Sequence, residues 1–280
     1  MKVAVTGASG FIGRHVFTDL LEHELDVVAV TRDATRLAGL SEAVRIVEMD
    51  ISDPAPYCFE QMGGPDVLIH LAWDGLPNYK SLHHFETELP RQYHFLNTMI
   101  KAGLPSLLVT GTCFEYGMQS GSLSEEMPTK PNNPYGYAKD ALRQQLDFLK
   151  SVKPFNLTWA RLFYMYGEGQ PSTSLYPKLK EAVLRGDKVF NMSGGEQLRD
   201  YLSVNEVARQ IVKLAIAPRD TGVINICSGN PISVRKLVEQ WISENNWEID
   251  LNLGYYPYPD YEPLAFWGDR QRLDTIPEQQ

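Results

Sequence analysis

The sequence predicts an α/β protein, built on a doubly wound parallel sheet with a smaller mixed α/β lobe. In the first half of its 280 residues, short and nearly continuously apolar runs alternate with helical stretches. Strands of that kind are buried on both faces, as in a parallel sheet. After about Gly167 the alternation breaks down, and Gly, Pro, Ser and Thr become frequent. The second half is therefore expected to form the smaller lobe around elements that return to the sheet.

The predicted strands of the first half begin directly at the N-terminus. They span residues 2–6, 26–31, 44–48, 66–70, 106–110 and 156–161. The predicted helices between them span residues 10–22, 35–40, 82–102 and 134–151. In the second half we expect helices over 175–185, 204–217 and 233–244, and a strand over 222–226. Alternation of this length favours right-handed crossovers and a doubly wound sheet.

Composition and charge argue against several classes of partner. The net charge is −9 and no run of Lys or Arg stands out, so we expect no nucleic-acid partner. Met1 and Lys2 lead directly into the first strand, which leaves no room for a signal peptide, and no apolar run approaches the ~18 residues of a membrane span. Cys58, Cys113 and Cys227 are too widely spaced for a metal knuckle and are interpreted as reduced thiols. We therefore expect a cytoplasmic protein that does not bind membranes.

Histidines and a glutamate in the predicted helix 82–102 are the one group that suggests a metal. These residues are His83, His84, Glu86 and His94, and His84 and His94 fall on different faces of the helix. We interpret the histidines as solvated or interface side chains and expect no metal.

A glycine triplet separates the first predicted strand from the first predicted helix. Residues 7–13 read GASGFIG, with the spacing Gly-x-x-Gly-x-x-Gly. Such a loop turns tightly and lets its backbone approach a pyrophosphate without a Cβ in the way, while the helix N–H groups face the phosphates. A glycine triplet alone also marks ordinary turns, but its place between a strand and a helix predicts a dinucleotide-binding, Rossmann-type domain. We expect cofactor contacts from Gly7, Gly10, Phe11, Ile12 and Gly13.

The glycine loop also predicts how the chain is divided. Residues 1–168 are expected to form the dinucleotide-binding domain, to which elements at about 200–228 return. Residues 169–199 and 229–280 are expected to form the substrate-binding lobe.

The residues after the second and third strands bear on which dinucleotide is bound. An NAD site usually places a carboxylate at the end of the second strand, but this chain has Thr31 there, then Arg32, with Arg36 one turn further. Because a guanidinium binds a 2′-phosphate and a carboxylate repels it, we expect NADP(H) to be preferred, with NAD(H) possible. A solvated surface arginine is the competing interpretation. Asp50, next to Ile51, either accepts from the adenine amino group or lies in an exposed turn.

A tyrosine and a lysine share one face of the predicted helix 134–151. Tyr135 and Lys139 are four residues apart, about one turn. An ammonium group lowers the pKa of a neighbouring phenol by favouring phenolate, so the tyrosine becomes a proton donor or acceptor near neutral pH. Thr112, at the end of the fifth strand, is placed to hydrogen-bond the same substrate oxygen.

Together these motifs resemble the extended short-chain dehydrogenase/reductase family. The resemblance rests on the glycine loop, on Thr-x-x-x-Tyr-Gly at 112–117, on Pro-Tyr-x-x-x-Lys at 134–139, and on segments at 161–167, 195–201 and 225–229. It covers nearly the whole chain. It implies nucleoside-diphosphate sugar substrates, homodimers joined through a helix bundle, and a catalytic set of Thr112, Tyr135 and Lys139. It also implies cofactor contacts from Leu71, Tyr135, Lys139 and Leu162.

Departures from the family's patterns narrow the reaction. The sugar-nucleotide 4,6-dehydratases carry an Asp-Glu pair directly after the catalytic Thr, where this chain has Cys113-Phe114. Neither side chain can act as that acid/base pair, so elimination of water is not expected. The asparagine usual in the sixth-strand motif is replaced around Tyr164-Met165, which weakens any residue-level mapping of the substrate there.

Candidate substrate contacts complete the expected site. They are Trp73, Phe114, Tyr164 and Arg199. Trp73 either caps the sugar pocket or packs in the core. Arg199 is the candidate for the substrate diphosphate, with a salt bridge to Asp200 or Glu206 as the alternative.

The resemblance and its departures predict an NADPH-dependent reductase. It would reduce the 4-keto group of a nucleoside-diphosphate 4-keto-6-deoxyhexose to give a deoxysugar nucleotide. The alternative is a nucleotide-sugar 4-epimerase with tightly bound NAD. A catalytically silent nucleotide sensor is a third possibility, but it has no need of a Thr–Tyr–Lys set.

Overall fold

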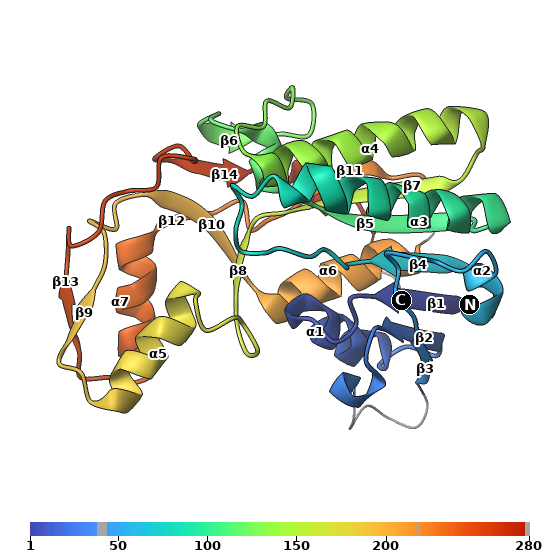
Figure 1. The fold of residues 1–280 in the computed structure, drawn as a ribbon. Helices are drawn as coiled ribbons and strands as arrows, with labels where there is room; N and C mark the ends of the chain where they lie inside the picture. Colours follow the sequence, from blue (N-terminus) through green and yellow to red (C-terminus); the bar gives the residue numbers. More distant parts are fainter. Residues whose placement is uncertain (38–43, 218, 278–280) are drawn as a thin grey trace.

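The computed structural model describes residues 1–37, 44–217 and 219–277. Its centre is a seven-stranded sheet in the order β11-β7-β5-β4-β1-β2-β3, with all neighbours parallel (Figure 1). The strands are β1 (Lys2–Thr6), β2 (Asp26–Thr31), β3 (Arg45–Glu48), β4 (Val67–His70), β5 (Ser106–Thr112), β7 (Asn156–Leu162) and β11 (Gly222–Ile226). The predicted doubly wound α/β fold is confirmed.

Helices cover both faces of this sheet, which explains why its strands are apolar throughout. α1 (Phe11–Leu20) and α6 (Val204–Ile216) pack on one face and share a hydrophobic core with α8 (Gln271–Asp274). α2 (Cys58–Gln61), α3 (Leu89–Ala102) and α4 (Pro134–Val152) pack on the other face (Figure 1). Because the strands are all parallel, their carboxyl ends lie at the same edge of the sheet, where the loops that follow them can form a ligand site.

A separate hydrophobic core holds the smaller lobe. α5 (Leu175–Arg185) and α7 (Val234–Glu244) pack together there, beside the paired strands β9 (Val189–Asn191) and β13 (Asp250–Asn252). A three-stranded sheet of β12 (Pro231–Ser233), β10 (Leu198–Ser203) and β8 (Tyr164–Tyr166) joins this lobe to the main sheet (Figure 1). β6 (Gly121–Leu123) pairs with β14 (Phe266–Gly268). The expected domain boundaries stay a prediction.

Several expected elements differ in extent. The expected helix 82–102 is divided into a π-helix, His84–Glu88, and α3, because Pro90 has no N–H for the carbonyl one turn before it. The expected helix 35–40 is a 3₁₀ helix, Ala34–Leu37, and its remaining residues lie outside the described part of the chain. The three-residue strands β6, β8, β9, β12, β13 and β14 were not predicted, because so few residues show no clear alternation. The six-residue β10 was not predicted either, because its sequence, LRDYLS, does not alternate between apolar and polar residues.

Two further expectations concern the whole chain. All three cysteines are buried and free of disulfides, as expected. Among the described residues, no helix has the length and apolar character needed to cross a bilayer.

Candidate active site

The glycine loop between β1 and α1 is shaped so that side chains are excluded. Gly7 has φ +74°, and a Cβ there would lie 2.8 Å from the Ala72 nitrogen. A Cβ on Gly13 would lie 2.2 Å from the Gly7 carbonyl oxygen. Gly10 is the N-cap of α1 and no side chain caps it, so the amide groups of the first turn are left to a ligand. This cradle fits the pyrophosphate of a dinucleotide.

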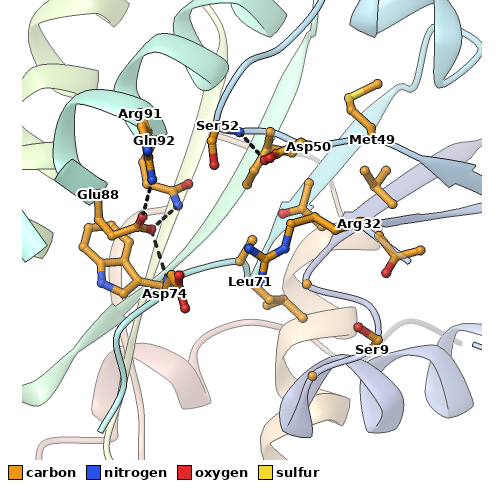
Figure 2. Close-up of a pocket in the computed structure, with 18 of the residues that line it drawn as sticks. Ser9, Arg32, Met49, Asp50, Ser52, Leu71, Asp74, Glu88, Arg91 and Gln92 are labelled. Atoms are coloured by element: carbon orange, nitrogen blue, oxygen red, sulfur yellow. Dashed lines mark hydrogen bonds and ion pairs between the residues drawn. The ribbon is translucent and has the colours of Figure 1, made fainter. Parts of the chain in front are cut away.

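A cavity of about 230 Å³ opens above this loop, at the carboxyl ends of the strands (Figure 2). The expected cofactor residues that line it are Gly7, Gly10, Arg32, Arg36, Asp50, Ile51 and Leu71. The others expected to touch the cofactor do not line it: Phe11, Ile12 and Gly13 lie on α1, Tyr135 and Lys139 on α4, and Leu162 at the end of β7. We call this space the dinucleotide cavity.

The end of β2 presents arginines rather than carboxylates to the dinucleotide cavity. Arg32 and Arg36 line it, whereas the neighbouring Asp33 does not, and the Asp33 carboxylate accepts hydrogen bonds from Thr35 instead. Asp50 also lines it, and its Oδ1 accepts from the Ser52 amide at 2.9 Å (Figure 2). That hydrogen bond is the main cause of the lowered pKa of Asp50.

The start of α4 fixes the expected Tyr–Lys pair. Asn133 caps the helix, with its Oδ1 accepting from the Gly136 amide at 2.8 Å, and Pro134 follows as the first residue. A Cβ on Gly136 would lie 2.6 Å from the Phe114 carbonyl oxygen, so glycine lets α4 pack against the 3₁₀ helix Cys113–Tyr116. Tyr135 and Lys139 are both buried on that face, as the four-residue spacing predicts.

Thr112, Tyr135 and Lys139 come together at the end of β5, but the phenol is not acidified as expected. Burial, reinforced by Tyr79 and Glu115, raises the pKa of Tyr135, while a hydrogen bond with the Thr112 side chain lowers it in part. Lys139 donates to the Thr110 carbonyl at 2.9 Å, and its Nζ lies 3.9 Å from the centre of the Trp73 ring. Burial lowers the pKa of Lys139 to about 7, against the opposing effect of Glu115 and Glu88. The expected lowering of the Tyr135 pKa is therefore wrong for this structure, because burial is the largest influence on that pKa.

A buried carboxylate that the sequence analysis missed supports Thr112. Glu115 is fully buried, and its oxygens accept from the Thr112 amide at 2.8 Å, the Trp159 indole at 3.0 Å and Arg161 Nε at 2.6 Å. Thr112 and Glu115 form a capping box around the 3₁₀ helix. The Thr-x-x-Glu spacing of that box was the signal in the sequence.

A second missed group lies beneath the dinucleotide cavity. His70 Nδ1 is 2.8 Å from the Thr6 hydroxyl and its Nε2 is 2.7 Å from Gln92 Oε1, and Gln92 in turn donates to Glu88 at 2.9 Å. Burial, then the positive charge of Lys139, lowers the pKa of His70 to about 3. These hydrogen bonds, with a neutral imidazole at their centre, tie the strand before the glycine loop to α3.

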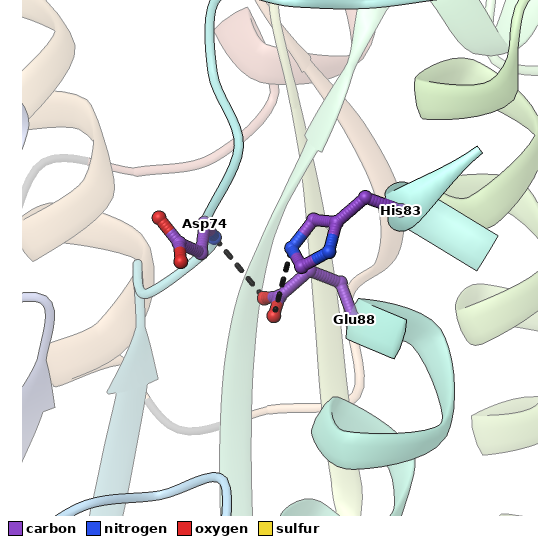
Figure 3. A group of neighbouring side chains, drawn as sticks. All are labelled: Asp74, His83 and Glu88. Carbon is purple, nitrogen blue, oxygen red and sulfur yellow. Dashed lines mark hydrogen bonds and ion pairs between the residues drawn. The ribbon is translucent and has the colours of Figure 1, made fainter. Parts of the chain in front are cut away.

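Glu88 also belongs to a small group of possible metal ligands. Donor atoms of Asp74, His83 and Glu88 all lie within 4.8 Å of one another (Figure 3). However, one Glu88 oxygen already accepts from the Asp74 amide at 3.0 Å and from Gln92, and Arg91 lies 3.9 Å from the other. These contacts make Glu88 an anchor for the loop that contains Asp74.

The histidines of this region were expected to be solvated or at an interface. That is wrong for His84, which is fully buried, accepts from the Trp73 indole N–H at 3.1 Å and lies 2.9 Å from the Asn78 carbonyl through Nε2. His94 is exposed, as expected. Trp73 was expected either to contact the sugar or to pack in the core. It lines the dinucleotide cavity and packs against the core of α3 and α4, and it is not among the residues that line the larger cavity described next.

A cavity of about 550 Å³ lies on the other side of Tyr135, toward the smaller lobe. We call it the aromatic cavity, because its walls include Tyr79, Phe114, Tyr164, Tyr166, Tyr176, Tyr201, Trp241 and Tyr261. The Tyr135 ring touches Tyr79 and Phe114 from this cavity and Trp73 from the dinucleotide cavity, with ring centres 5.6, 6.4 and 6.0 Å away. Tyr135 therefore stands between the two cavities.

A smaller cavity of about 300 Å³ adjoins the aromatic cavity and contains Arg199. Both alternatives expected for an ion pair of Arg199 are wrong, because it pairs with Glu262 at 2.8 Å. Asp200 instead accepts from the Ser228 and Gly229 amides. Tyr164 donates to the same Glu262 carboxylate. The tail residue Glu262 thus holds two of the expected substrate residues together.

Comparisons with known proteins agree with this architecture. The chain is 31% identical over 270 residues to dTDP-6-deoxy-L-talose 4-dehydrogenase (NAD(+)) of Aggregatibacter actinomycetemcomitans, covering 96% of this chain and 99% of that protein. It is 27% identical to GDP-6-deoxy-D-talose 4-dehydrogenase of the same organism, over 99% of this chain and 91% of that one. The solved structure of MoeE5 in complex with UDP-glucuronic acid and NAD superposes with a TM-score of 0.82 at 27% identity, covering 99% of this chain and 92% of that chain.

A family model matches most of the chain. The model described as NAD dependent epimerase/dehydratase family covers residues 3–227, which include the glycine loop, Thr112, Tyr135 and Lys139. The resemblance to extended short-chain dehydrogenase/reductases is thereby confirmed. The chain belongs to the NAD-dependent epimerase/dehydratase family.

Proposed function

We propose that this protein is an oxidoreductase that interconverts the 4-hydroxyl and 4-keto forms of a nucleoside-diphosphate 6-deoxyhexose, with reduction by NADPH as the forward direction. One observation carries this proposal: Tyr135, with Thr112 and Lys139 beside it, stands between the dinucleotide cavity and the aromatic cavity. A proton donor in that place reaches a substrate oxygen whose carbon faces the cofactor.

The glycine cradle would hold the pyrophosphate of the cofactor, whose nicotinamide ring supplies the hydride when it is bound. The Thr112 hydroxyl would orient the substrate carbonyl. The Tyr135 phenol would give its proton to the carbonyl oxygen as the carbon accepts the hydride, so that the ketone becomes an alcohol. The Lys139 ammonium, one helical turn away, would stabilise the phenolate that is left.

The surroundings of Thr112 favour hydride transfer without elimination of water. Cys113 and Phe114 are buried, and burial raises the pKa of the Cys113 thiol. The nearest carboxylate in sequence, Glu115, is engaged by Thr112, Trp159 and Arg161. None of these three side chains is a free acid/base group beside the substrate oxygen.

The relatives support the position of the reaction on the sugar. Two of them are named 4-dehydrogenases of 6-deoxytalose nucleotides, which is the reverse of the reduction proposed here. A diphosphate would meet Arg199, and the sugar would lie toward Phe114 and Tyr164.

We propose NADP(H) as the preferred cofactor. Arg32 and Arg36 line the dinucleotide cavity beyond β2, where Asp33 does not. Two guanidinium groups suit the 2′-phosphate, whereas 6-deoxytalose 4-dehydrogenase is named for NAD(+). NAD(H) is therefore the competing cofactor in every assay below.

We further propose that the protein is a homodimer. Large apolar side chains are exposed along α4: Tyr137 at 54%, Phe148 at 74% and Val152 at 79%. Pairing of α3 and α4 with a second copy would cover them. Sedimentation velocity tests this proposal: the wild type should sediment as a dimer, and Phe148→Glu should weaken the dimer. A monomeric wild type would contradict the proposal.

The function is tested with purified protein, NADPH and a panel of dTDP-, GDP- and UDP-linked 4-keto-6-deoxyhexoses. We expect stoichiometric loss of NADPH absorbance with one of them, from protein that is purified largely free of cofactor. Protein that retains NAD through purification and interconverts two sugars with no added cofactor would instead be a 4-epimerase, and would overturn the proposal.

A further inference from the structure

Trp73 and His84 form a hydrogen-bonded pair beside the proposed catalytic residues. Trp73 follows β4, and its indole N–H donates to His84 Nδ1 at 3.1 Å. Because Nδ1 accepts, the proton of the neutral imidazole lies on Nε2, which donates to the Asn78 carbonyl at 2.9 Å. His84 is fully buried, and burial lowers its pKa, so the ring stays neutral. Both ring nitrogens are satisfied, and the indole is held in one orientation.

The face of that indole carries the Lys139 ammonium. Nζ lies 3.9 Å from the ring centre, well within the range of a cation–π contact. Nζ donates a hydrogen bond to the Thr110 carbonyl at 2.9 Å, and no carboxylate of the described residues pairs with it within 4.0 Å. The Thr110 carbonyl and the Trp73 ring face are therefore the close contacts that stabilise a charge that is only 2% exposed.

We propose that Trp73 is a positioning residue that keeps Lys139 charged and directed toward Tyr135, and that His84 acts through Trp73 by fixing its ring. This proposal rests on the proposed function, in which Lys139 stabilises the Tyr135 phenolate. It gives Trp73 a role other than the sugar contact or core packing expected from the sequence.

The charges around Lys139 explain why the ring matters. Burial lowers the pKa of Lys139 to about 7, and loss of the ring face would lower it further. The titratable groups that face it come from every element packed there: Glu115 and Glu88 favour the charged form, His70 and His84 are neutral, and Tyr135 is on its own helix. Since both carboxylates are anchored elsewhere, they cannot move closer to replace the indole.

The test is the pH profile of kcat/KM for reduction of a dTDP-linked 4-keto-6-deoxyhexose at saturating NADPH. Reduction needs Lys139 charged, so activity falls as pH rises through its pKa. In Trp73→Leu the charged form is less stable, and we expect this alkaline fall to begin about half a unit to one and a half units lower in pH. Trp73→Phe keeps an aromatic face and loses the N–H, so its shift should be smaller.

His84→Phe tests the indirect part of the proposal. The substitution removes a neutral side chain and adds no charge. A shift of the pH profile must therefore come through the Trp73 indole, which loses its hydrogen-bond acceptor. We expect a shift in the same direction as in Trp73→Leu, but smaller. His94→Gln, which removes an exposed histidine from α3, is the matched control and should leave the profile unchanged.

The outcomes separate this inference from the function on which it rests. A profile of Trp73→Leu that keeps its alkaline limb, with only a lower Tm or lower rate, would show a packing role and overturn the inference. If Trp73→Leu does not fold, unchanged limbs in both Trp73→Phe and His84→Phe overturn it equally. Near-normal turnover of Tyr135→Phe would instead overturn the proposed function itself.

Discussion

The two cavities that meet at Tyr135 are built in different ways. The dinucleotide cavity is formed mainly by loops that directly follow β1, β2, β3 and β4, and Arg32 and Arg36 lie within five residues of the end of β2. Glu88, Arg91 and Gln92 complete its lining from the helical segment 84–102. The aromatic cavity is assembled from segments far apart in sequence, including Tyr79, Phe114, Tyr164, Trp241 and Tyr261. Local motifs specify the first cavity, whereas the second exists only when distant segments pack together.

The cavities also differ in how their charges are arranged. Around the dinucleotide cavity, neither Arg32 nor Arg36 forms an ion pair within the described part of the chain, whereas Arg91, which also lines the cavity, lies 3.9 Å from Glu88. At the aromatic cavity, Lys80 pairs with Asp260 at 2.8 Å, and Glu262 pairs with Arg199 at 2.8 Å. If Arg199 binds the substrate diphosphate, as proposed, a nucleotide sugar would have to compete with Glu262 for it, whereas the proposed 2′-phosphate would meet Arg32 and Arg36 beyond the end of β2.

The largest effect is expected at the boundary between the cavities, from Glu115→Gln. The substitution keeps the shape of the side chain but leaves the Arg161 guanidinium buried without its partner. Breaking a buried pair in this way costs about 3–5 kcal/mol of unfolding free energy. Denaturant unfolding measures it, and Glu126→Gln, at a carboxylate that is 90% exposed, should change little. A small loss for Glu115→Gln would mean that the pair does not hold this boundary together.

Features built from local segments could be predicted from the sequence, whereas features that join distant segments could not. The individual strands of the sheet, the glycine loop and the buried face of α4 were predictable, because each is encoded in a short continuous segment. The partner of Arg199 was not, since Glu262 lies 63 positions further along the chain. The role of Glu115 was missed although its capping box with Thr112 is local, because the segment was interpreted only as a family motif. The burial of His84 was not predictable, because it depends on where Trp73 lies in the fold.

Tyr135→Phe is the sharpest test of the idea that the reaction takes place between the cavities. It removes only the hydroxyl, so turnover should fall roughly 10²-fold or more, because the proton donor is lost. The Kd for NADPH should hardly change. Tyr137→Phe, two residues along the same helix and 54% exposed, is the matched control. Turnover of Tyr135→Phe within a few fold of wild type would remove this residue from the chemistry.

The arginines of the dinucleotide cavity give the next largest effect. If Arg32 binds the 2′-phosphate, Arg32→Ala should weaken NADPH binding by roughly 10- to 150-fold, the range for loss of a charge-assisted hydrogen bond of about 1.5–3 kcal/mol. NADH lacks that phosphate, so its affinity serves as the internal control. Fluorescence titration at two ionic strengths should also show a smaller preference at high salt. Equal losses for both cofactors would mean that Arg32 supports the loop, and a wild type that prefers NADH would refute the choice of cofactor.

The smallest predicted effect concerns the buried hydrogen bonds beneath the dinucleotide cavity. His70 has a pKa of about 3 in the folded protein, against 6.5 for an ordinary histidine. Its folded pKa is depressed, so below pH 6.5 the unfolded chain takes up a proton that the folded protein cannot. Stability is therefore complete above pH 6.5 and falls as pH drops toward 3.

Between pH 7 and pH 5 this single group should lower the free energy of unfolding by about 2 kcal/mol. The measurement is urea unfolding of wild type and His70→Gln at both pH values. His70→Gln loses stability at pH 7, because Thr6 and Gln92 lose the ring that joins them, but the difference from wild type should shrink by that amount at pH 5. His94→Gln, at an exposed position, should follow wild type at both pH values. A constant difference between wild type and His70→Gln would mean that the pKa of His70 is the same in the folded and unfolded chain, so that the ring becomes charged in the fold at pH 5. That result would remove the contrast between a neutral imidazole here and the paired charges around the aromatic cavity.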